Sequence, residues 1–169
     1  TLTQSGIIVP GEPTHHLCMK AWELIRSVHP DLPTVRIHLH KTIPLGAGMG
    51  GGSSDGAFAL SLLNDLFHLR HTKEELARLA LQLGSDCPFF LYNEPCIARG
   101  RGEQLMPVNC ELVNFELLVI HPGIHISTKQ AFAGIVPSEE GPPLETLIQG
   151  PVTSWRDTIH NDFERTVFA

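Results

Sequence analysis

The feature that most constrains this chain is a glycine-rich loop between a predicted strand and a predicted helix. Five of the seven residues from 46 to 52 are glycine, and Ser53 and Ser54 follow directly. Glycine lets a backbone approach an anion closely and adopt positive φ, and a helix start offers free N–H groups and the positive end of the helix dipole. A flexible Gly–Ser linker is not expected to join a strand to a helix. The loop therefore predicts a phosphate-binding site.

The residues around the loop predict a mixture of helices and strands. Val35, Ile37 and Leu39 alternate with polar residues, which indicates a half-buried strand before the loop, and apolar residues at helical spacing predict a helix over 57–69 after it. Thr72 and Glu75 form a capping box that opens the next helix, which Gly84 ends. The other expected elements are helices over 14–28 and 156–168, a short helix near 144–148, short strands at 96–100 and 103–105, and a buried strand over 115–120. This order favours an α+β fold over a regular βαβ alternation.

Composition excludes several classes of protein. The 169 residues carry a formal charge of −6, which argues against a general nucleic-acid-binding surface. The chain holds no apolar run near the ~20 residues of a membrane span, so we expect no membrane partner. Its four cysteines form no C-x-x-C pair and have apolar neighbours, which favours buried free thiols and a cytoplasmic location. The histidine pairs His38/His40 and His121/His125 lack a nearby cysteine or carboxylate, so we expect no metal ligation there.

Three kinds of phosphate-binding loop compete for the glycine-rich segment. A P-loop is excluded because no lysine follows the last glycine. The dinucleotide fingerprint G-x-G-x-x-G matches at Gly46, Gly48 and Gly51, but it needs an acidic strand end ~20 residues on, and Asp65 lies inside a predicted helix. The pattern P-x-x-x-G-[LM]-G-x-[SG]-S-[SAD] matches from Pro44 through Ser54. It is the nucleotide loop of the GHMP small-molecule kinases.

Further motifs extend this resemblance over nearly the whole chain. In order, the sequence resembles the 4-diphosphocytidyl-2-C-methyl-D-erythritol kinase family of the GHMP superfamily at residues 41–55, 83–90 (LGSDCPFF), 98–103 (ARGRGE), 127–132 and 161–164 (NDFE). Each motif alone is modest, but five in the right order are specific.

The resemblance implies a fold, cofactors and roles for particular residues. It implies a GHMP kinase fold, with residues 1–110 as a nucleotide-binding, ribosomal protein S5 domain 2-like part and 111–169 as the start of a ferredoxin-like part. It implies ATP and Mg²⁺ as cofactors, and ATP-dependent phosphorylation of the 2-hydroxyl of 4-diphosphocytidyl-2-C-methyl-D-erythritol in the non-mevalonate isoprenoid pathway. Asp86 would be the catalytic carboxylate, Thr128 and Phe132 would bind the substrate, and Ser54 would contact Mg²⁺. The implied nucleotide-binding residues are Lys41, Pro44, Leu45, Gly46, Ala47, Gly48, Met49, Gly50, Gly51, Gly52, Ser53 and Ser54.

Some of these residues also have a simpler interpretation. Asp86 fits an ordinary turn, one of the two serines fits a helix N-cap, Lys41 fits a solvated strand end, and Phe132 fits the core. The chain departs from the family at His16, where asparagine is usual, and at Gly56, where alanine is usual.

The family also has a catalytic lysine and a Tyr-His pair that would precede Thr1, and a glycine-rich loop that would follow Ala169. We therefore expect a chain truncated at both ends, with negligible kinase activity by itself. The alternatives are another GHMP small-molecule kinase, a dinucleotide-binding oxidoreductase that uses Gly46, Gly48 and Gly51, and a non-catalytic binding module.

Overall fold

The computed structural model describes residues 1–110, 112–124, 128–136 and 141–164, without the side chains of residues 128–130. It divides into two units. The first unit comprises residues 1–94 and 98–105, and the second comprises residues 95–97 and 106–169. The predicted boundary between residues 110 and 111 stays a prediction.

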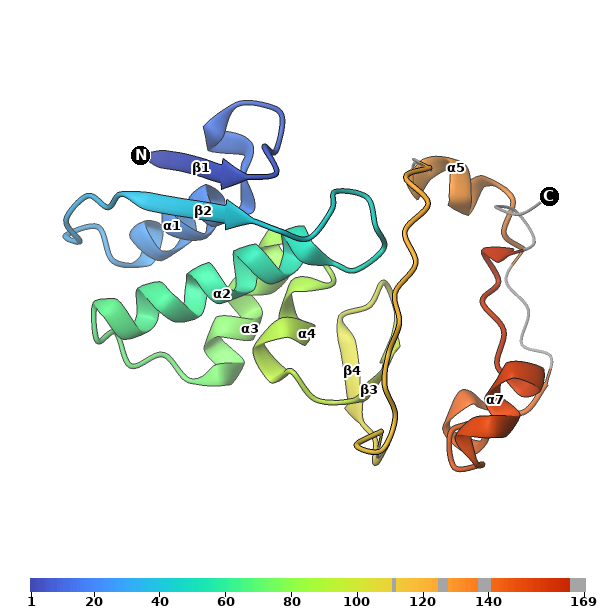
Figure 1. Cartoon of the computed structure of the whole chain (residues 1–169). Coiled ribbons are helices and arrows are strands. Elements are labelled where there is room, and N and C mark those ends of the chain that lie inside the picture. The colour runs from blue at the N-terminus through green and yellow to red at the C-terminus, as the bar shows by residue number, and fades with distance from the viewer. Residues whose placement is uncertain (111, 125–127, 137–140, 165–169) are drawn as a thin grey trace. The chain divides into compact units, whose positions relative to one another are not determined.

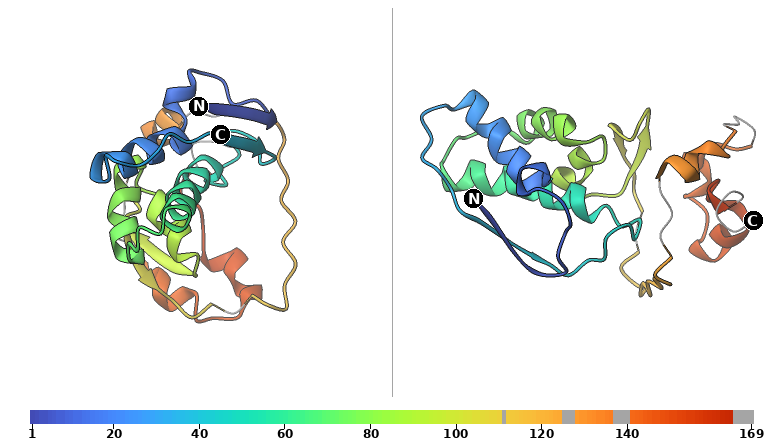
Figure 2. Two further views of the ribbon diagram at one scale, coloured as in Figure 1. Left: turned by 90° about the vertical axis from the view of Figure 1, so that its left-hand side faces the viewer. Right: turned by 90° about the horizontal axis from the view of Figure 1, so that it is seen from above.

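In the first unit, a pair of strands lies beside a group of helices (Figure 1). The strands β1 (Leu2–Gly6) and β2 (Ile37–Lys41) pair in parallel, with Leu2 opposite Ile37 and Gly6 opposite Lys41. Between them the chain forms the short 3₁₀ helix η1 (Pro13–His15) and the helix α1 (Leu17–Val28). The helices that follow are α2 (Gly51–Leu66), α3 (Lys73–Leu83) and α4 (Cys87–Tyr92). Two further views show α1 to α4 gathered on one side of the strand pair (Figure 2).

The hydrophobic core of the first unit lies between these helices. Its buried side chains come from all four helices: Ala21, Trp22, Ile25, Ala57, Leu60, Leu63, Leu76, Ala80 and Cys87. Val35 and Ile37 pack against this cluster from the strand side. Burying such apolar side chains is the main favourable term in folding, so this core fixes the start of α2 and the start of α4 against each other.

Most local predictions in this unit are confirmed, with some different boundaries. The capping box at Thr72 is present, since Glu75 N–H donates to Thr72 Oγ1 at 3.2 Å and Thr72 N–H donates to Glu75 Oε2 at 2.9 Å. The helix predicted over 57–69 begins earlier, at Gly51. Glycines form its first turn despite their low helix propensity, because this turn lies on a packed core. The predicted helix over 14–28 is split into η1 and α1. The strand β1 was not predicted.

The second unit carries short elements with little packing. They are α5 (Thr128–Ala133), α6 (Leu144–Leu147) and α7 (Val152–Thr158). Near the junction of the units, β3 (Cys96–Arg99) and β4 (Gln104–Pro107) form a two-stranded sheet, as the sequence predicted. The short helix predicted near 144–148 is confirmed.

Two predictions in the second unit are wrong. Residues 115–120 form no strand and are exposed, because among the described residues no strand lies alongside to pair with them. The helix predicted over 156–168 is α7, which begins at Val152 and ends at Thr158; residues 165–168 lie outside the described part.

Candidate functional site

The glycine-rich loop runs from the end of β2 to the start of α2. Gly46, Gly48 and Gly50 have φ values of 66°, 69° and 62°. This left-handed conformation favours glycine because it has no Cβ. The N-cap of α2 is Gly50, which has no side chain to cap the helix. The first N–H groups of this sixteen-residue helix therefore open onto the loop.

Two glycines also have close neighbours. A Cβ on Gly50 would lie 2.7 Å from Cζ of Phe90, and a Cβ on Gly51 would lie 3.0 Å from Nζ of Lys41. A Cβ on Gly52 would meet nothing within 4 Å, so its open side faces unfilled space. The contact with Phe90 brings α4 directly against the end of the loop.

A cavity of about 350 Å³ lies over the loop. Its lining contains Leu17 and eleven of the twelve residues predicted to bind nucleotide: Lys41, Pro44, Leu45, Gly46, Ala47, Gly48, Met49, Gly50, Gly51, Gly52 and Ser53. Ser54 is outside this lining, and its N–H donates to Gly50 O at 2.9 Å within the first helical turn. The loop therefore shapes a cavity at the positive end of a helix dipole, an arrangement that suits an anion.

Lys41 is buried at the end of β2 and does not fit a solvated strand end. Its Nζ donates to Oδ2 of Asp55 at 2.6 Å, and the two side chains are 4% and 25% exposed. Asp55 had no predicted role. Its place in the second turn of α2 was the only signal in the sequence, and the pairing with Lys41 depends on how β2 and α2 pack.

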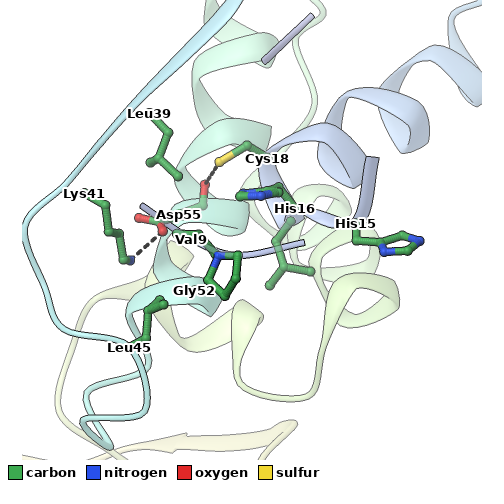
Figure 3. A pocket seen from close by; sticks show the side chains of 11 residues that line it. Val9, His15, His16, Cys18, Leu39, Lys41, Leu45, Gly52 and Asp55 are labelled. Carbon is green, nitrogen blue, oxygen red and sulfur yellow. Dashed lines mark hydrogen bonds and ion pairs between the residues drawn. The ribbon is translucent and has the colours of Figure 1, made fainter. Parts of the chain in front are cut away.

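A second cavity of about 180 Å³ is lined by both members of the Lys41–Asp55 pair (Figure 3). Four residues line both cavities: Leu17, Lys41, Leu45 and Gly52. The remaining wall is mainly apolar and comes from the segment after β1, from η1 and the start of α1, from β2 and from α2: Val9, Pro10, His15, His16, Cys18, Leu39 and Asp55. None of the residues in this remaining wall was predicted as a site residue.

Polar bonds hold this wall in place. Val9 N–H donates to Oε1 of Gln4 at 2.9 Å, and Nε2 of Gln4 lies 3.4 Å from Nε2 of the buried His16. The Cys18 thiol donates to the backbone O of Asp55 at 3.6 Å. Burial, followed by the nearby Asp55 carboxylate, raises the pKa of Cys18 to about 11, although Lys41 opposes this shift. Cys18 is therefore a neutral thiol in the cavity wall at neutral pH.

Asp86 lies immediately before α4, the helix that packs on the loop. It is the N-cap residue, yet its carboxylate makes no capping bond to α4; it accepts a long bond of 3.4 Å from the Ser85 hydroxyl. Oδ1 of Asp86 would lie 2.9 Å from a Cβ on Gly102, whose φ is 109°. The turn that carries Gly102 is held by Glu103, which accepts from Arg101 N–H at 2.6 Å. An exposed carboxylate is thus positioned between α4 and a tight glycine turn.

The two predicted substrate residues lie in the second unit. Thr128 begins α5, and Phe132, four residues later, is 61% exposed, which does not fit the core interpretation. The rings of Phe132 and Phe163 meet edge to face with centroids 4.9 Å apart. The motif at residues 161–164 thus packs against the motif at 127–132 within one unit.

Comparisons with known proteins find relatives of this chain. The family model described as the GHMP kinases N terminal domain matches residues 16–94, which include the loop, Asp55 and Asp86. A protein from Cytophaga hutchinsonii, described as 4-diphosphocytidyl-2-C-methyl-D-erythritol kinase, is 42% identical over 98% of this chain and 62% of the relative. A protein of the same description from Azobacteroides pseudotrichonymphae is 45% identical over the same shares.

The chain is a homologue of these kinases in the GHMP kinase family. A crystal structure described as 4-(cytidine 5'-diphospho)-2C-methyl-D-erythritol kinase matches with a TM-score of 0.75 and 29% identity, over 99% of this chain and 60% of that one. The α+β GHMP kinase N-terminal fold is thereby confirmed. The chain spans about three fifths of the length of the curated relatives it matches.

One observation bears on the dinucleotide-binding alternative. Asp65 lies within α2, so it is not the acidic strand end that a dinucleotide-binding oxidoreductase needs after Gly46, Gly48 and Gly51. Among the residues that the structure describes, no helix has the length and apolar character needed to cross a membrane.

Proposed function

We propose that this chain forms the nucleotide-binding part of an ATP-dependent kinase that phosphorylates the 2-hydroxyl of 4-diphosphocytidyl-2-C-methyl-D-erythritol in the non-mevalonate isoprenoid pathway. The observation that carries the proposal is the contact between Phe90 and Gly50. This contact sets the helix that begins after Asp86 against the loop that would hold the triphosphate. A carboxylate and an anion cradle are the two parts that phosphoryl transfer to a hydroxyl needs.

The triphosphate would lie in the cavity over the loop. The N–H groups at the start of α2 and the helix dipole favour its negative charge. The ammonium of Lys41 has three donors, and Asp55 uses one of them, so others are left for a phosphate oxygen. Ser53, which lines the cavity, and Ser54 carry hydroxyls, which are oxygen ligands of the kind that Mg²⁺ prefers, and they would hold an ion that neutralises phosphate charge. The cavity lined by His16 and Cys18 would take the nucleotide's base.

Asp86 would act on the acceptor hydroxyl. In this step the 2-hydroxyl oxygen forms a bond to the γ-phosphorus, the bond from that phosphorus to the bridging oxygen breaks, and ADP leaves. The carboxylate orients the hydroxyl and takes its proton. The missing capping bond at Asp86 supports this role, because its oxygens are not used to cap α4.

The other proposals rest on the resemblance. Thr128 and Phe132 would contact the substrate, with the exposed ring of Phe132 stacking on cytosine. We also propose the ribosomal protein S5 domain 2-like and ferredoxin-like assignments, the cytoplasmic location and the absence of nucleic-acid and membrane partners. Another GHMP small-molecule kinase is the second candidate, since the loop and Asp86 would serve any small alcohol.

Nucleotide binding is tested by titrating the protein with a non-hydrolysable ATP analogue and Mg²⁺ and following the amide resonances. The amide resonances of residues 48–54 should shift, whereas those of α3, which lines neither cavity, should not. Binding with no change at residues 48–54 would remove the loop from the proposal.

The role of Asp86 is tested with Asp86→Asn in the longest natural polypeptide that contains this sequence. The kcat should fall by about 10²–10⁴-fold with ATP affinity nearly unchanged. Asp65→Asn is the matched control, because Asp65 is an exposed aspartate on α2 outside both cavities. An Asp86→Asn protein with normal kcat and a lower melting temperature would show a purely structural role. Turnover of 4-diphosphocytidyl-2-C-methyl-D-erythritol against other small alcohols separates the two kinase candidates.

A further inference from the structure

Two histidines face each other at a place that the proposed kinase function does not use. His29 is the C-cap residue of α1, and His71 lies in the connection between α2 and α3. Their Nε2 atoms are 2.8 Å apart, and their rings meet edge to face with centroids 5.0 Å apart. Neither residue lines the loop cavity or the cavity beside it.

Glu75 determines which nitrogen of His71 carries the lone pair. Oε2 of Glu75 lies 3.5 Å from Nδ1 of His71. The N–H of Thr72 donates to the same oxygen at 2.9 Å and holds the carboxylate in place. The carboxylate accepts a hydrogen bond from the N–H at Nδ1 of His71, which leaves Nε2 as the acceptor in the neutral ring. His29 then supplies the single proton that lies between the two Nε2 atoms.

The backbones of both histidines are held in place. The N–H of His71 donates to Oδ1 of Asn64 at 2.9 Å, and the N–H of His29 donates to the O of Ile25 at 2.9 Å. Ile25 lies on α1 and Asn64 on α2, and these two helices share the buried core of the first unit. The His71 side chain is nevertheless 19% exposed, which gives an ion access from solvent.

We propose that His29 and His71 form a binding site for a borderline transition-metal ion such as Zn²⁺, which replaces the proton between their Nε2 atoms. A carboxylate that accepts the other ring N–H of a ligating histidine is the usual outer shell of such sites, and Glu75 holds this position. A neutral imidazole suits Zn²⁺ and Cu²⁺, whereas Mg²⁺ prefers oxygen ligands, so this site is chemically distinct from that of a nucleotide-bound metal.

The geometry sets what the site requires. Metal–nitrogen bonds of about 2.0–2.1 Å at a tetrahedral angle separate the two nitrogens by about 3.4 Å, so the rings must move apart by about 0.6 Å. Rotation of the partly exposed His71 ring supplies a shift of this size. Among the described residues no group of three or more histidine, cysteine, aspartate or glutamate side chains converges, so water fills the remaining positions and the ion exchanges readily.

The site is tested by titrating the whole chain with Zn²⁺ in isothermal calorimetry, with imidazole resonances followed in parallel. We expect one saturable site that shifts the ring signals of both His29 and His71. His29→Ala and His71→Ala should each weaken binding at least tenfold, and Glu75→Gln should weaken it about tenfold, because glutamine can replace glutamate in the capping box but carries no charge.

The matched control removes two other histidines. His38 and His40 lie on β2 and both contact Oγ of Ser5, at 2.9 and 2.8 Å. His38→Ala/His40→Ala should leave Zn²⁺ binding unchanged. Binding that survives His29→Ala/His71→Ala, or that is lost in the His38→Ala/His40→Ala control, would overturn the proposal. The absence of saturable binding to the unmodified chain would show that the pair holds only a shared proton. Circular dichroism verifies that each variant is folded, and none of these results depends on ATP.

Discussion

At the scale of single residues, Gly102 lies beside the proposed catalytic carboxylate. A Cβ on Gly102 would lie 2.9 Å from Oδ1 of Asp86, and the φ of Gly102 is 109°. Gly102→Ala should therefore strain the turn and displace the carboxylate, lowering kcat by at least tenfold with ATP affinity nearly unchanged. Steady-state kinetics with both substrates measure this. Gly123→Ala is the control, because Gly123 also has positive φ but has open space around it. Equal effects of the two substitutions on kcat would contradict the positioning role.

The Lys41–Asp55 pair gives an asymmetric prediction for stability. Removing one partner leaves the other charge uncompensated, and the ammonium is the more buried of the two. Asp55→Ala should lower the free energy of unfolding by about 3 kcal/mol, and Lys41→Ala should lower it by less, because Asp55 keeps contact with water. Urea denaturation monitored by circular dichroism measures both values. A larger loss for Lys41→Ala would show that the ammonium has another partner or more solvent than the structure gives it.

The Cys18 thiol allows a chemical test of its surroundings. Only the thiolate is alkylated, and a pKa raised from 9.0 to about 11 lowers its fraction at pH 8 by roughly 100-fold. Cys18 should therefore react with iodoacetamide far more slowly than Cys110, for which exposure is intermediate. Its reactivity should rise as the pH is raised toward 11, since the thiolate then accumulates. Peptide mapping after timed alkylation measures both rates, and rapid labelling of Cys18 at pH 8 would contradict its burial.

At the scale of elements, the capping box of α3 shows what local sequence determines. Thr72→Ala removes the oxygen that accepts from Glu75 N–H, and it should cost about 1 kcal/mol of stability. Thr72→Ser keeps a hydroxyl acceptor and should cost much less. The melting temperatures of the two variants measure both losses of stability. Equal losses would mean that the methyl group of Thr72 matters more than its oxygen.

Features that depend on adjacent residues were predicted from the sequence. Features that depend on packing between distant segments were not. The glycine loop and the capping box follow from the conformational needs of a few adjacent residues. The early start of α2 at Gly51 runs against glycine's helix propensity, and it forms because α4 packs on it through Phe90. The Lys41–Asp55 pair could not be predicted, since it joins a strand to a helix.

At the scale of the whole molecule, the distribution of buried side chains separates the two units. Among the described residues, every buried apolar side chain except Ile97 lies in the first unit. Residues 115–120 are apolar except for Glu116, and such a run indicates a buried strand only where a neighbouring strand exists to pair with it. The amino-acid composition of this run is that of a core strand, yet in this structure its side chains face solvent.

This exposure predicts where the folded chain is cut first. Leu117 and Leu118 are 89% and 85% exposed, outside any helix or strand, whereas Leu60 and Leu63 are buried in α2. A protease must unfold a segment locally before it cleaves, and a segment with few packed contacts opens at almost no free-energy cost. Limited chymotrypsin digestion should therefore cut within residues 115–120 and leave an N-terminal fragment of about 115–120 residues that resists further cleavage. Intact-mass spectrometry over time identifies the fragment, and digestion in denaturing urea, where all leucines are accessible, is the control. A first cut within α1 to α4 would show that the helical core of the first unit opens more readily than the exposed apolar run.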